Sequence, residues 1–138
     1  MLTEERGYTA AEMLVAIGTM GILFSMAVVG LGTLAPQFDL DNAARRVAMV
    51  LSQGRVQAIT RGHRIVVSFG EGEATITDDT DGVEMATETF PPHIYVSASG
   101  DTTFTPVGTA TTPVSVTVSN GSSSREITVG LIGGVQIQ

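Results

Sequence analysis

The segment Gly7-Tyr8-Thr9-Ala10-Ala11-Glu12-Met13-Leu14 opens a long apolar run in this chain of 138 residues. No charged residue follows Glu12 until Asp39, a distance greater than the roughly 18 apolar residues that mark a membrane-spanning helix. Glu12 lies just inside the head of this run, where an ionised group is costly and usually functional. The run therefore predicts a transmembrane segment over residues 13–35 and makes Glu12 a candidate functional residue.

The composition fits one domain joined to a membrane segment. Hydrophobic residues make up 43% of the chain and charged residues 15%, and the length leaves no room for a second globular unit. The formal net charge is -7 and every basic residue is arginine, so we expect no nucleic-acid partner. Cysteine is absent, so no disulfide is predicted.

The first residues resemble the head of a type IV prepilin. Residues 1–7 form a short polar leader that ends in Gly7, and Tyr8 and Glu12 follow at that family's offsets. The resemblance implies that a prepilin peptidase cuts between Gly7 and Tyr8 and methylates the new amino terminus on Tyr8. It also implies that Glu12 is the assembly residue, which pairs with the free amino terminus of a neighbouring subunit.

Two other interpretations explain less of the sequence. A secretory signal peptide has a basic start, an apolar core of roughly 7–15 residues and a small-x-small cleavage site, whereas the best site here follows Ala35 and precedes Pro36. An ordinary signal anchor leaves the spacing of Gly7, Tyr8 and Glu12 unexplained. The positive-inside rule favours the opposite orientation, so a cytoplasmic amino end rests on the resemblance alone.

Beyond the apolar run, residues 39–62 have an amphipathic pattern. We expect Pro36 to kink or interrupt the helix, and one of Asp39, Asp41 or Asn42 to cap a restarted helix. An apolar stripe at helical spacing predicts the face that lies on a sheet: Leu40, Ala44, Val47, Leu51, Gly54 and Ala58. The other face is expected to be solvated and carries Arg45, Arg46, Arg55 and Arg61.

The helix is expected to end at Gly62. Beyond it, the apolar residues no longer recur at helical spacing but alternate with polar residues, a period of two. Residues 63–138 therefore predict a β-rich domain of short antiparallel strands joined by tight turns. The expected strands are 64–69, 73–77, 83–90, 94–97, 114–118, 125–129 and a last one within 131–137. The predicted fold class is α+β, with an amino-terminal helix over residues 8–62 packed on an antiparallel sheet.

This order resembles the pilin fold, and three stretches resemble the GspH/FimT type of minor pseudopilin. They are residues 54–62 at the helix end, Phe104-Thr105-Pro106-Val107-Gly108, and Arg125-Glu126-Ile127 with Gly134-Val135. In that family the subunits lie at or near the tip of a secretion pseudopilus or prime a type IV pilus. The resemblance implies three partners, namely other pseudopilins or pilins, prepilin peptidase and the inner membrane, with the carboxyl-terminal domain in the periplasm.

Three aspartates form a possible weak calcium loop. Asp78, Asp79 and Asp81 precede Gly82, as in part of an EF-hand. Thr77 stands where that pattern needs its first aspartate, so we favour a solvated acidic turn.

No other candidate site is predicted. His63 and His93 have no second ligand at metal spacing, and neither a nucleophile elbow nor a phosphate loop is present, so we expect no enzyme, metal or cofactor. Two functions remain as alternatives: an anchored periplasmic domain that binds a ligand or partner without polymerising, and a DNA-uptake minor pilin. Beyond Arg64 only Arg125 is basic, which places secretion ahead of DNA uptake.

Overall fold

The computed structural model describes residues 8–138, apart from the side chains of residues 29–35. These described residues form one helix and eight strands. Contacts divide the chain between Pro36 and Gln37 into two compact units, and the helix α1 (Ala10–Arg61) contributes to both. The predicted leader, including Gly7, lies outside the described residues.

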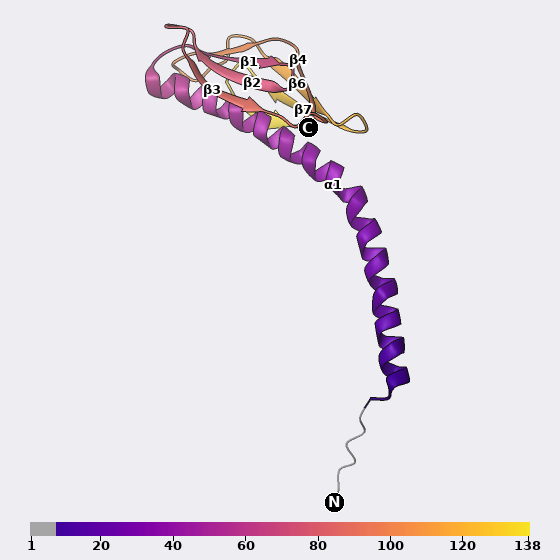
Figure 1. Ribbon diagram of the computed structural model, residues 1–138. Helices are drawn as coiled ribbons and strands as arrows, with labels where there is room; N and C mark the ends of the chain where they lie inside the picture. The colour runs from indigo at the N-terminus through magenta and orange to yellow at the C-terminus, as the bar shows by residue number, and fades with distance from the viewer. Residues whose placement is uncertain (1–7) are drawn as a thin grey trace, which may run out of the picture. The chain divides into compact units, whose positions relative to one another are not determined.

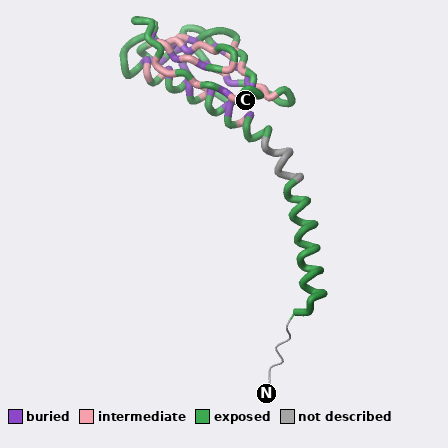
Figure 2. Tube along the Cα trace, in the orientation of Figure 1, coloured by how far each residue is buried: buried purple, intermediate pink, exposed green. Residues whose placement is uncertain are grey.

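The first unit contains the apolar part of α1. Residues Ala10–Val28 are long and apolar enough to cross a membrane, and their side chains are exposed (Figure 2). In an isolated chain such a surface has no partner in water, because an apolar side chain gains free energy only where it is removed from solvent. This part of α1 therefore needs a lipid or protein environment that the described residues do not supply.

The predicted interruption at Pro36 is wrong, because Pro36 lies inside a continuous α1. A proline inside a helix removes one backbone hydrogen bond, and the turns on both sides keep theirs. No restarted helix needs a cap, and two of the expected capping residues have other partners: Asp39 lies 3.4 Å from His93, and Asp41 lies 3.0 Å from Arg125.

The second unit combines the rest of α1 with two antiparallel sheets (Figure 1). The first sheet has the order β3-β2-β1-β5 and contains β1 (Ile65–Gly70), β2 (Glu73–Asp78), β3 (Glu84–Thr89) and β5 (Thr102–Phe104). The second has the order β4-β6-β7-β8 and contains β4 (Tyr95–Ala98), β6 (Val114–Ser119), β7 (Ser124–Val129) and β8 (Val135–Ile137). The sequence predicted seven of these strands to within a few residues, but it predicted neither β5 nor the division of the strands between two sheets.

The predicted apolar stripe of α1 is buried against the strands. Its buried hydrophobic residues are Leu40, Ala43, Ala44, Val47, Val50, Leu51 and Ala58, and Figure 2 shows this buried side of the helix turned toward the sheets. A fully buried valine or leucine contributes about 1.5–3 kcal/mol. Packing of this face therefore holds the second half of α1, since tertiary contacts outweigh intrinsic propensity in most protein helices.

Ion pairs flank the helix on both sides. Arg46 pairs with Glu88 of β3 and also donates to the backbone oxygen of Thr89. On the other side, Asp41 pairs with Arg125 of β7. These pairs join α1 to one strand of each sheet.

Candidate assembly surfaces

Glu12 closes the amino-terminal end of α1 as part of a capping box. Its carboxylate accepts hydrogen bonds from the backbone N–H of Thr9 at 2.9 Å and from the Thr9 hydroxyl at 3.0 Å. The Glu12 N–H in turn donates to the Thr9 hydroxyl oxygen at 3.2 Å. This reciprocal arrangement satisfies backbone donors that the first helical turn leaves unpaired. The Thr-x-x-Glu spacing is its sequence signature, and our reading of the sequence missed it.

The surface beside Glu12 is apolar and uncovered. A depression of about 360 Å³ is lined by Ala11, Glu12, Val15 and Ala16. Small side chains let another helix approach closely. Tyr8, the predicted new amino terminus, is 83% exposed. The first turn thus presents one carboxylate within an apolar surface that a second helix could cover.

Two of the stretches that resemble minor pseudopilins meet tightly between α1 and the first sheet. A Cβ at Gly54 would lie 2.5 Å from Cγ2 of Val67 and 3.5 Å from the ring of Phe104. Real Cβ atoms do not approach a neighbour as closely as 2.5 Å, so α1 lies nearer to β1 than any other residue at position 54 would allow. Here glycine is required for close approach of the helix to the sheet.

Arg55 joins the same region to the second sheet, and the prediction that it is solvated is wrong. Its side chain is partly buried, and Nε donates a hydrogen bond of 2.8 Å to the backbone oxygen of Gly108. A Cβ at Gly133 would overlap that same oxygen and lie 2.9 Å from the Arg55 Nε. Two of the stretches that carry the resemblance, residues 54–62 and 104–108, therefore meet at one junction, and the turn that precedes Gly134 lies against it. Their separation in sequence concealed this relation.

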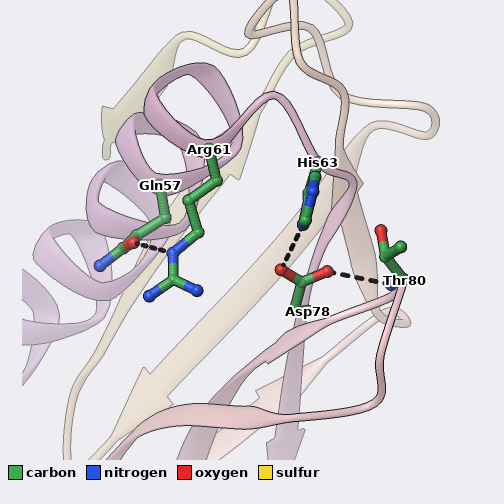
Figure 3. A network of polar contacts seen from close by, with 5 residues as sticks. All are labelled: Gln57, Arg61, His63, Asp78 and Thr80. Carbon is green, nitrogen blue, oxygen red and sulfur yellow. Dashed lines mark hydrogen bonds and ion pairs between the residues drawn. The ribbon is translucent and has the colours of Figure 1, made fainter.

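Asp78 has a structural environment that differs from the predicted solvated turn (Figure 3). Its side chain is buried, with one carboxylate oxygen 2.8 Å from Nδ1 of His63 and the other accepting the Thr80 N–H at 2.9 Å. The hydrogen bond from His63, followed by that from the Thr80 backbone, lowers the pKa of Asp78 below its ordinary value. A carboxylate that is buried must have such partners, and together they join the end of α1 to β2.

The other aspartates of this loop do not gather around Asp78. Asp79 lies 3.5 Å from Nε of Arg64, and Asp81 is exposed. Among the described residues no group of three or more histidine, cysteine, aspartate or glutamate side chains is arranged to hold a metal ion. The possible calcium loop remains a prediction that direct titration has to test.

A long amino-terminal helix with an apolar first part, packed through its second part on antiparallel sheets, defines a pilin-like protein, and the predicted α+β pilin fold is confirmed. A family model described as Type II transport protein GspH matches residues 43–133, more than half of the chain. The chain therefore belongs to the GspH family of type II transport proteins.

Solved structures agree with this fold. The type IV minor pilin FimU of Pseudomonas aeruginosa is 17% identical, with a TM-score of 0.65 over 74% of this chain and 90% of that chain. The minor pseudopilin EpsH from the Type 2 Secretion System of Vibrio cholerae is 12% identical, with a TM-score of 0.61 over 72% of this chain and 96% of that chain. No curated protein sequence matches the chain. The predicted resemblance to minor pseudopilins of the GspH/FimT type is confirmed.

Proposed function

We propose that this protein is a structural subunit of a type II secretion pseudopilus. Prepilin peptidase cuts between Gly7 and Tyr8 and methylates Tyr8, the apolar part of α1 anchors the chain in the inner membrane, and the β-rich domain lies in the periplasm. The subunit then enters the filament through its amino-terminal helix. It works by assembly and has no catalytic role.

The observation that carries this proposal is the exposed apolar surface of α1 with a single carboxylate at its head. An ionised carboxylate held at the bilayer centre costs about 2.5–3.5 kcal/mol, and Glu12 lies within the span Ala10–Val28. A free amino terminus on a neighbouring subunit would supply the opposite charge in the same layer. That pairing offsets the cost of desolvation and sets the axial register of adjacent helices.

Because Glu12 belongs to a capping box, an experiment must distinguish its effect on helix stability from its effect on pairing between subunits. The Glu12 carboxylate accepts two hydrogen bonds from Thr9 within its own chain, so replacing Glu12 removes one side of the capping box together with a charge. Loss of an N-cap interaction costs about 0.5–2 kcal/mol of helix stability, whereas loss of the intersubunit charge pair removes the partner of a cationic terminus. The two effects are separated by a variant that weakens the cap and keeps the charge.

We expect Glu12→Val to insert into the membrane and to be cleaved normally but to be absent from sheared filaments. Thr9→Ala removes the hydroxyl of the capping box and keeps the Glu12 carboxylate, so it should assemble. Immunoblots of the filament and membrane fractions from the native host measure both. Normal incorporation of Glu12→Val, or equal loss of incorporation in both variants, would contradict the assembly role of Glu12.

Secretion is favoured over DNA uptake because most of the basic residues already have partners within the chain. Arg64 and Arg125 are each near an aspartate, Asp79 and Asp41 respectively. A DNA-binding surface needs several arginine or lysine side chains free to neutralise phosphates, and over residues 8–138 only Arg45 has no hydrogen bond or ion pair. Tight binding of DNA in a gel-shift assay at low salt would reverse this ranking.

A further inference from the structure

The groove between α1 and β8 carries a net positive charge in an otherwise acidic chain. It has a volume of about 470 Å³ and is lined by Asp41, Ala44, Arg45, Arg125 and Ile137. Two arginines and one aspartate face this groove, although the whole chain has a formal charge of -7. Ala44 is buried and Ile137 is 46% exposed, so the groove also has an apolar part.

Arg45 is the free cation of this groove. Asp41 is already paired with Arg125 at 3.0 Å. The other arginines that the structure describes have partners: Glu88 for Arg46, the Gly108 oxygen for Arg55, Gln57 for Arg61 and Asp79 for Arg64. Over residues 8–138, by contrast, Arg45 is exposed and has no hydrogen bond or ion pair. The one carboxylate of the groove, Asp41, is taken by Arg125, so a second carboxylate is the group that would complement Arg45.

The edge of β8 offers backbone groups beside this cation. Glu126 and Gln138 exchange both backbone hydrogen bonds, at 3.2 and 2.8 Å. In an antiparallel ladder the adjacent residue directs its N–H and C=O to the other side, so those of Ile137 face the open edge. An extended segment placed there can pair with β8 while its side chains reach the groove.

The other sheet edges of the described chain are protected in ways that β8 is not. β3 carries Glu84 and Glu88, and charged side chains discourage edge pairing. β4 contacts β1 of the other sheet, and β5 is covered by the bridge between Phe104 and Ala110. The residues of β8, Val135–Ile137, carry no charge. This edge is thus open to pairing, with Arg45 as the charge next to it.

From this geometry we propose that the groove between α1 and β8 binds an extended, carboxylate-bearing segment of a neighbouring pilin-like subunit. The segment adds a strand to β8 and places its carboxylate against Arg45. This inference rests on the proposed role as a filament subunit and adds the surface through which the periplasmic unit recognises its neighbour. Because the contact is ionic, it selects an acidic partner and disfavours a basic one.

Photo-crosslinking in the native host tests the groove. A photo-crosslinking amino acid at Ile137 of the full-length chain should join a second pilin-like subunit in sheared filaments. Arg45→Glu places like charges together, which costs enough to lower the crosslink yield by about tenfold or more. Arg45→Lys keeps the cation and should retain most of the yield. The same probe at Thr117, which is exposed on the outer face of the second sheet, should give a yield that does not respond to Arg45→Glu.

Several results would overturn the proposal. They are a filament that contains the chain but gives no Ile137 crosslink, a yield unchanged by Arg45→Glu, and lipid as the main adduct. In each of these cases the filament role would stand and the groove alone would fail. A chain that never enters filaments would overturn both. Because Arg45 has no partner within the described chain, unchanged thermal unfolding of Arg45→Glu should show that its fold is intact.

Discussion

At the scale of single residues, Asp78 links the end of α1 to the strands through His63 and the Thr80 backbone. Both interactions favour the charged carboxylate, which is why the pKa of Asp78 is lowered. A group with a lowered pKa in the folded state stabilises that state above its unfolded pKa and loses this contribution as the pH falls through the folded value. The stabilisation is therefore present at neutral pH and is lost in acid.

We expect Asp78→Asn to lower the free energy of unfolding at pH 7. The difference from the wild type should begin to narrow below about pH 4, the ordinary aspartate value, because the unfolded chain then takes up the proton. It is lost once the pH falls through the lower pKa of the folded state, where the wild-type carboxylate is protonated as well. Urea denaturation of the full-length protein in detergent between pH 2 and pH 7, roughly the range in which a carboxylate titrates, measures this difference. Asp81→Asn is the control, since Asp81 is exposed and has no ion pair in the described chain. A difference that is independent of pH would refute the account of Asp78.

At the scale of elements, the close approach of α1 to β1 depends on Gly54. Alanine at an ordinary helix position is favoured over glycine by about 0.8–1.0 kcal/mol. At position 54 its Cβ would meet Val67 at 2.5 Å, and overpacking of this kind typically costs about 1–3 kcal/mol. The two effects oppose each other, and the larger one is the clash.

We expect Gly54→Ala to destabilise the protein by up to about 2 kcal/mol, the clash less the gain in helix propensity. Val67→Ala removes the contacting methyl group, so the double variant should be more stable than the sum of the single effects by about 0.5–3 kcal/mol. Chemical denaturation of the four proteins gives this coupling energy. If the changes in the free energy of unfolding were strictly additive, the Gly54–Val67 contact would not be what limits the approach of α1 to β1.

The sequence predicted α1 and its buried face because a helical period can be read from neighbouring residues alone. The helical period did not predict the environment of Arg55. This residue lies on the polar side of the stripe, so its side chain was predicted to be solvated. Its partner, the Gly108 oxygen, is far away in sequence, and no local pattern reports such a contact. Asp78 was misread for the same reason, since its partner His63 precedes the neighbouring strand β1 at the open end of the hairpin. The Thr9–Glu12 cap, by contrast, was readable from its spacing.

At the scale of the whole molecule, the chain combines a unit that needs an external partner with one that is packed internally. The exposed apolar residues of Ala10–Val28 require lipid or other helices. The unit from Gln37 to Gln138 has its own core. In a filament subunit the first unit is surrounded by lipid before assembly and by neighbouring helices after it. The apolar helix leaves the bilayer only when those helices replace the lipid. The proposed charge pair of Glu12 requires, in addition, that a cleaved amino terminus exists.

The most direct test of the central claim is mass spectrometry of the amino terminus of this protein in filaments sheared from its native host. The account predicts a chain that begins at Tyr8 and carries one methyl group on its terminal nitrogen. A chain in the filament fraction that still begins at Met1 would contradict it. Such a chain would have no charged terminus beside Glu12.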